Sequence, residues 1–129
     1  MVVHGPLPAE RVAALYQNAD VFVLSSLREP YGTVWGEAMA AGLPVVGWRA
    51  GNLPHLAEHG REGLLASPGD VAALSAALAR LAGDEDLRRS MAVAASRRAG
   101  ARPTWARSAA LFFAALHEAV SAGQATGPA

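Results

Sequence analysis

The 129-residue sequence contains no cysteine and no lysine, and only 6% of its residues are aromatic. Without cysteine, the chain can form neither a disulfide framework nor a zinc–thiolate site. Its eleven basic residues, all arginines, balance eleven acidic ones, and a net charge of zero argues against nucleic acid as the main partner. Because there is no membrane-length apolar run and no charged N-terminal targeting region, we expect a cytoplasmic protein.

The length and the 52% apolar fraction indicate one globular domain with its own core. Short apolar runs alternate with segments of helical periodicity, which predicts parallel strands joined by helices in a Rossmann-like α/β fold. We expect this domain to cover residues 1–122, and residues 123–129, rich in Gly, Ala, Thr and Pro, to be a disordered tail. The expected strands are residues 1–4, 21–24, 45–48 and 64–65, and the expected helices are residues 8–18, 33–42, 54–58, 71–82, 85–99 and 105–122.

The stretch from Glu29 to Val46, EPYGTVWGEAMAAGLPVV, carries the strongest functional signal. It predicts a helix that begins near Gly32, with Glu29 just before its start and Glu37 about one turn inside. A helix N-terminus offers free N–H groups and the positive end of the macrodipole, which suit a phosphate. Carboxylates accept hydrogen bonds from hydroxyls. A sugar nucleotide fits this pattern, because its diphosphate lies between two hydroxyl-bearing groups, the ribose and the sugar.

This stretch resembles the donor-binding signature of retaining GT-B glycosyltransferases of the family 4 type, the glycosyl transferases group 1. In that signature, two glutamates separated by seven residues lead into an EAMAxGxPVV unit, and residues 37–46 here read EAMAAGLPVV. The resemblance continues through Gly5, residues 19–26, Gly60 and residues 63–65, and so covers nearly the whole chain. It implies the latter part of the C-terminal donor half of a GT-B fold, incomplete at its N-terminal side. It also implies hexosyl transfer with retention from a UDP- or GDP-linked sugar, without a cofactor or metal.

The resemblance also assigns roles to residues. Glu37 is expected to bind the ribose hydroxyls, and Glu29, as the catalytic residue, the hydroxyls of the transferred sugar. The backbone N–H groups of Gly32, Thr33 and Val34 are expected to bind the diphosphate and the sugar. The loop that ends at Leu7 is expected to bind the base.

Each of these residues also has a plainer interpretation. Glu37 could be an exposed helix glutamate, Glu29 could pair with Arg28, and Thr33 could serve as a helix cap. The two glutamates could also be a glycosidase acid/base pair, but a phosphate-ready helix N-terminus between them disfavours hydrolysis.

Residues 55–59, HLAEH, match the H-x-x-E-H zinc pattern. Pro54 and Gly60 leave barely two helical turns there, and no third ligand is evident, so we expect a short packing helix. Asn52 and His55 depart from the Gly-Gly-x-Pro-Glu loop of the family, which leaves the donor preference open.

The C-terminal third is basic and amphipathic. Its arginines either contact an anionic membrane surface or form a solvated face balanced by acidic neighbours. We expect the apolar stripe that includes Trp105 and Phe112 to be core. The arginines of this basic region are Arg88, Arg89, Arg97, Arg98, Arg102 and Arg107, and their acidic neighbours are Asp84, Glu85 and Asp86.

A GT-B enzyme places its active site between two Rossmann-like domains, and the resemblance covers only part of one. It therefore implies an N-terminal acceptor domain in cis or in trans, and we expect no transfer by this chain alone. One sheet edge should lie exposed or be covered by a second copy. The alternative is a non-catalytic nucleotide-binding or interaction module.

Overall fold

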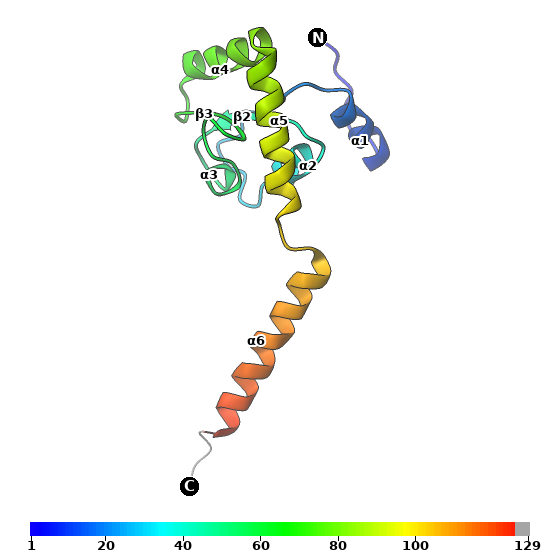
Figure 1. Cartoon of the computed structure of the whole chain (residues 1–129), viewed down its shortest axis with the longest axis vertical. Coiled ribbons are helices and arrows are strands. Elements are labelled where there is room, and N and C mark those ends of the chain that lie inside the picture. The colour runs from blue at the N-terminus through cyan, green and yellow to red at the C-terminus, as the bar shows by residue number, and fades with distance from the viewer. Residues whose placement is uncertain (126–129) are drawn as a thin grey trace.

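The computed structural model describes residues 1–125 and contains a parallel sheet flanked by helices (Figure 1). The sheet has three strands in the order β1-β2-β3, with bounds Phe22–Leu24, Val45–Trp48 and Gly63–Ala66. Val45 lies opposite Phe22 on one side and Gly63 on the other. The predicted α/β class and the strands expected at residues 21–24, 45–48 and 64–65 are confirmed.

The helices follow the expected order. Helix α3 lies one to two residues earlier than predicted, and α6 continues through Gly123. Part of the expected tail, residues 123–125, is thus helical, and residues 126–129 lie outside the described residues. The bounds are α1 Ala9–Gln17, α2 Thr33–Ala40, α3 Leu53–Leu56, α4 Val71–Gly83, α5 Glu85–Gly100 and α6 Trp105–Ala125.

Strand β2 lies at the centre of the core, and all four of its residues are buried. Val45 packs in one cluster with Trp35 and Met39 of α2. Val46 packs in a second cluster with Leu74 and Leu81 of α4. Successive side chains of a strand point to opposite faces, so these clusters mark the two covered faces of a parallel strand.

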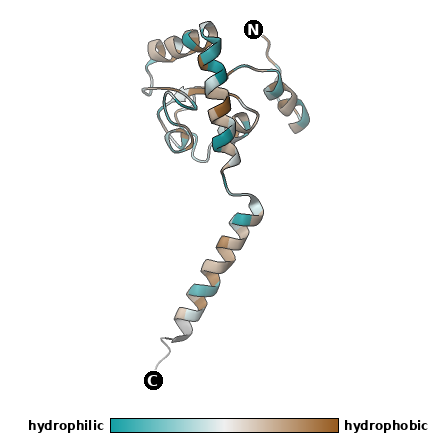
Figure 2. Cartoon of the chain, in the orientation of Figure 1, coloured by the Kyte–Doolittle hydropathy of each residue, from teal (hydrophilic) through white to brown (hydrophobic). Residues whose placement is uncertain are grey.

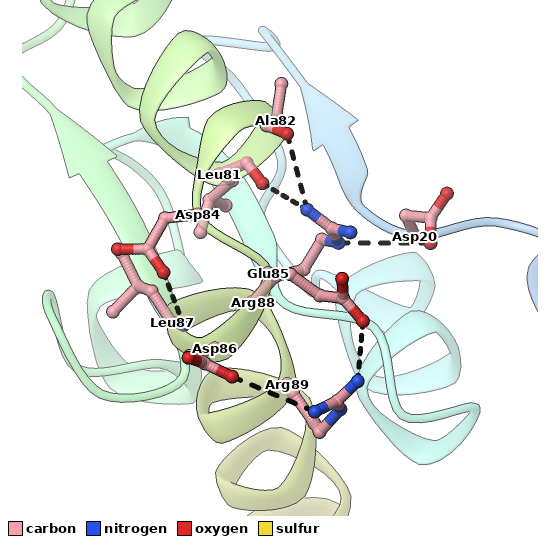
Figure 3. A network of polar contacts seen from close by, with 9 residues as sticks. All are labelled: Asp20, Leu81, Ala82, Asp84, Glu85, Asp86, Leu87, Arg88 and Arg89. Carbon is pink, nitrogen blue, oxygen red and sulfur yellow. Dashed lines mark hydrogen bonds and ion pairs between the residues drawn. The ribbon is translucent and has the colours of Figure 1, made fainter.

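The junction between α4 and α5 fixes α5 against the sheet (Figure 3). Asp84 Oδ1 accepts a hydrogen bond from the Leu87 N–H at 2.9 Å and caps the start of α5. Arg88 Nη1 donates to the Leu81 carbonyl at 2.7 Å, and Arg88 Nε lies 3.9 Å from Asp20 Oδ1. Since a cation is favourable at a helix C-terminus, Arg88 stabilises the end of α4 and links it to the start of β1.

The strand predicted at residues 1–4 is wrong. This segment has no regular structure, and Met1, Val2 and Val3 are exposed. A strand is stable only when its backbone groups pair with a neighbour, and in the described residues β1 pairs with β2 alone. The open edge of β1 agrees with the expected exposed sheet edge, whereas self-association through it stays a prediction.

The expected burial of the C-terminal apolar stripe is also wrong. Helix α6 projects away from the rest of the domain, with apolar side chains along its length (Figures 1 and 2). Trp105 is 93% exposed and Phe112 is 62% exposed. The amphipathic pattern predicted the helix correctly, but the large apolar side chains of α6 are exposed within the described residues. Within residues 1–125, no helix is long and apolar enough to cross a membrane.

Candidate functional site

The N-terminus of α2 has the geometry of an anion site. Gly32 precedes the helix in the left-handed conformation, with φ of 67°, and a Cβ there would lie 2.9 Å from Leu56 Cδ1. Glycine is therefore required at this turn. Gly32 holds the N-cap position and Thr33 is the first residue of α2, so the interpretation of Thr33 as the cap is wrong. Within the described residues, the N–H groups of Thr33 and Val34 have no acceptor and are free to bind an anion.

Glu29 lies directly at this turn. Its Oε1 accepts a hydrogen bond from the Gly32 N–H at 3.2 Å, and its carbonyl oxygen accepts one from the Asn52 N–H at 3.3 Å. No ion pair joins it to Arg28 in the part of the chain that the structure describes. The half-buried Glu29 is thus held by its own loop and by the loop that follows β2.

Asn52 is a contributor that the sequence analysis did not assign. Its Nδ2 donates to the Tyr31 carbonyl at 2.8 Å, which joins the loop before α3 to the loop before α2. Beside it, Gly51 has a φ of 57°, and a Cβ there would lie 2.8 Å from the Glu29 carbonyl oxygen. Both loops follow the carboxyl ends of parallel strands, where ligands bind in open α/β sheets.

Glu37 is exposed on α2 and faces α1. Burial raises the pKa of Tyr16, and the negative charge of Glu37, which accepts a hydrogen bond from the Tyr16 hydroxyl, raises this pKa further. The Tyr16 ring meets Phe22 edge-on at 5.7 Å between centroids, and Phe22 meets Trp35 at 5.3 Å. Tyr16 and Glu37 line a groove of about 510 Å³ between α1 and α2.

The sequence predicts a helix around Tyr16 but no partner for its side chain. Its hydroxyl was the available signal, because a buried tyrosine hydroxyl needs a hydrogen-bond partner. The pairing itself joins α1 to α2, which the sequence alone does not bring together.

Leu7 is set apart from the other predicted site residues. It is half-buried beside α1, in a depression of about 190 Å³ that it shares with His4 and Arg11. None of the other predicted site residues lines this depression. The structure thus places Glu29 at the turn before α2, beside the free N–H groups, and Glu37 in the middle of α2, where it faces α1. The strand expected at residues 1–4 is absent from the described residues.

The H-x-x-E-H pattern does not form the arrangement that a zinc helix needs. Helix α3 ends at Leu56, so His55 and His59 do not lie on one helix. His59 Nδ1 instead accepts a hydrogen bond from the Leu65 N–H at 2.9 Å and fixes the turn before β3. The short helix packs through Leu53, which is buried in the core.

Several C-terminal arginines have partners within the chain. Arg89 pairs with Glu85 and lies 3.8 Å from Asp86, as expected of a solvated, charge-balanced face (Figure 3). Arg98 Nε donates to the Leu56 carbonyl at 2.6 Å and Nη1 lies 3.9 Å from the buried Glu62. Arg98 therefore ties the end of α5 to α3 rather than facing a surface.

Comparisons with known proteins identify the family of the chain. The family described as glycosyl transferases group 1 matches residues 1–98. A D-inositol 3-phosphate glycosyltransferase from Corynebacterium kroppenstedtii is 40% identical over 81% of this chain and 23% of its own length. Sucrose-phosphate synthase from Thermosynechococcus elongatus superposes with a TM-score of 0.81 at 32% identity, over 95% of this chain and 30% of the synthase.

A third relative has been solved with a ligand. The Anabaena protein HepE in complex with UDP-glucose superposes with a TM-score of 0.64 at 34% identity, over 68% of this chain and 24% of HepE. The chain thus spans about a quarter of the length of such relatives, and its fold is that of the C-terminal donor half of GT-B enzymes. The chain belongs to the glycosyl transferases group 1 family.

Proposed function

We propose that this chain is the donor-binding part of a retaining, hexosyltransferase-type glycosyltransferase and that it binds a UDP- or GDP-linked sugar at the N-terminus of α2. One observation carries the proposal: the unpaired N–H groups of Thr33 and Val34 begin α2 directly after the Glu29 turn, and Glu37 lies about one turn further along the same helix. The binding of UDP-glucose by HepE, which is similar over most of this chain, supports the same ligand class.

Each of these groups binds a different part of the donor. The N–H groups of Thr33 and Val34 take the diphosphate, with the helix dipole adding favourable charge. Glu37 accepts hydrogen bonds from the ribose hydroxyls, and Glu29 from the hydroxyls of the sugar to be transferred. Leu7 would contact the base through its backbone atoms. The loop before α1 would take up the conformation for this contact when an additional polypeptide segment packs against it.

The Gly32 N–H has a different role from the N–H groups of Thr33 and Val34. Its N–H donates to Glu29 Oε1 in the free protein. A donor that approaches the turn either shares this N–H or takes it over, which releases Glu29 toward the sugar. The absent Cβ of Gly32 lets the phosphate approach the backbone closely.

Transfer needs more than this chain supplies. An acceptor must be held in line with the donor, and positive charge must stabilise the departing diphosphate. We infer that an N-terminal acceptor domain, in cis or in trans, provides these groups, so that the chain alone binds donor without transferring sugar. Arginines of the C-terminal third that lack partners would then face solvent or an anionic membrane surface in the cytoplasm.

The test is titration calorimetry of the chain with UDP, GDP and their glucose conjugates, beside Glu37→Ala. We expect one nucleotide to bind and the variant to lose about tenfold or more in affinity, since a carboxylate that bonds hydroxyls is removed. Glu10→Gln on α1 is the matched control, because Glu10 is exposed and has no ion pair in the described chain. Equal affinities of Glu37→Ala and the control would refute the assignment of Glu37.

An interaction module is the second candidate, favoured by the exposed apolar side of α6. A protein of this kind would bind none of the nucleotides in the same titration. Nucleotide binding that depends on Glu37 would favour the donor site over the interaction module.

A further inference from the structure

Arg102 lies between α5 and α6, against the first turn of α2. A Cβ at Gly36 would lie 2.7 Å from Arg102 Nη1, so the guanidinium occupies the space that glycine leaves open. Helix α5 brings it there: Arg88, near the start of α5, lines a groove with Gly42, just beyond the end of α2. Arg98, near the end of α5, reaches α3. The two helices thus run in opposite directions, and the end of α5 meets the start of α2.

The Arg102 side chain has no hydrogen-bond or ion-pair partner in the described chain, although it is half-buried. Neither carboxylate of the site pairs with Arg102, because Glu29 accepts a hydrogen bond from the Gly32 N–H and Glu37 faces Tyr16 on α1. A cation beside the first turn of a helix is repelled by the positive end of the macrodipole. The Arg102 guanidinium thus lies against the positive end of α2, with no carboxylate partner of its own in the described chain.

An anionic ligand would remove this conflict. We propose that Arg102 binds the diphosphate of the nucleotide seated at the N-terminus of α2, which makes it a donor-binding residue from the C-terminal end of the domain. The inference rests on the proposed function and adds to it a cationic group for the diphosphate in a chain that has no lysine. Guanidinium is suited to the role because its fixed fork of N–H donors matches two phosphate oxygens at once.

Gly36 has a place in the same proposal. Any side chain there meets the Arg102 guanidinium, whose flexible end would move away. Gly36→Ala should therefore displace Arg102 from the turn and weaken phosphate binding without touching the ligand itself.

The test compares nucleotides with and without phosphate. Calorimetry measures the affinity for UDP and uridine, and for GDP and guanosine, in the wild type, Arg102→Gln, Arg102→Lys and Gly36→Ala. We expect Arg102→Gln to lower the affinity for the diphosphate about tenfold and leave that for the nucleoside unchanged. Arg102→Lys should recover part of the loss. Gly36→Ala should behave like Arg102→Gln, and the double variant should lose no more than either single one.

Matched controls separate this inference from the proposed function. Arg97→Gln removes an exposed arginine that has no side-chain partner in the described chain and should leave both affinities unchanged. Diphosphate binding that depends on Glu37 but not on Arg102 overturns the inference alone. Equal losses for diphosphate and nucleoside in Arg102→Gln would also overturn it, because they indicate a structural role. If no nucleotide binds to the wild type, the proposed function fails and this inference fails with it.

Discussion

Replacement of Arg98 by methionine should destabilise the domain more than any other removal of a surface charge. Arg98 Nε donates to the Leu56 carbonyl at 2.6 Å, and Nη2 donates to the His55 carbonyl at 3.2 Å. Arg98 Nη1 lies 3.9 Å from Glu62 Oε1, and the Glu62 side chain is only 2% exposed. One arginine thus satisfies the end of α3 and compensates a buried carboxylate.

The size of the effect follows from these contacts. A hydrogen bond from a charged donor contributes about 1.5–3 kcal/mol, and the bond to Leu56 is partly buried. The bond to His55 is exposed and adds little. At an effective dielectric constant of about 20, the ion pair at 3.9 Å is worth about 4 kcal/mol before desolvation, which cancels most of it.

Glu62 also keeps other partners when Arg98 is lost. Its Oε2 accepts from the Glu58 N–H at 2.8 Å, and its Oε1 lies 3.4 Å from Arg61 Nε. We therefore expect Arg98→Met to cost about 2–3 kcal/mol of unfolding free energy. For a domain of this size, that lowers the melting temperature by about 10–20 °C.

Urea and thermal unfolding measure this cost, with Arg97→Met as the control. Arg97 is exposed, and its side chain has no partner in the described chain, so its replacement should change stability by less than about 0.5 kcal/mol. Combining Arg98→Met with Glu62→Gln should cost less than the sum of the two single changes. A loss for Arg98→Met that matches the control would refute this account of the network.

Two further outcomes concern the Tyr16 contact and the strand pairing. The chain has no lysine or cysteine, whose side chains would also lose protons at alkaline pH. Because burial and Glu37 raise the pKa of folded Tyr16 above 10.0, the unfolded state loses that proton first. Stability should fall as the pH rises above that value, and Tyr16→Phe should remove this part of the fall; an unchanged profile by denaturant unfolding would contradict the contact. A Cβ at Gly63 would overlap the Val45 carbonyl oxygen, so Gly63→Ala should cost about 3 kcal/mol, while Gly83→Ala, with open space around it, should cost nothing. Equal melting temperatures for these two variants would show that β2 and β3 can separate freely.

The sequence predicted the elements whose signals are local. Strand β2 and helix α2 were found because an apolar run, a glycine turn and a helical pattern all lie within residues 29–48. The carboxylate of Glu29 and the N–H groups of Thr33 and Val34 lie at one helix end for the same reason, with Glu37 about one turn further along.

The failures concern partners distant in the sequence. Residues 1–4 have strand composition but no neighbouring strand to bond, and the stripe through Trp105 has helical periodicity but no surface to cover it. Hydrophobic pattern indicates which face seeks burial, not what buries it. The contacts of Tyr16 with Glu37 and of Arg102 with Gly36 join elements that only the fold brings together.

The local fold determines which groups of the proposed donor site are held in place by this chain alone. Parallel strands β1 and β2 end at one edge, so the loops after them hold Glu29 and Asn52 together without help from the rest of an enzyme. In the proposed function, the groups that act only in transfer come from the acceptor domain. Substitutions at Glu29 or Glu37 should therefore change donor affinity to the same extent whether or not an acceptor domain is joined. An effect that appears only in the joined protein would mean that the donor site is completed across the interface.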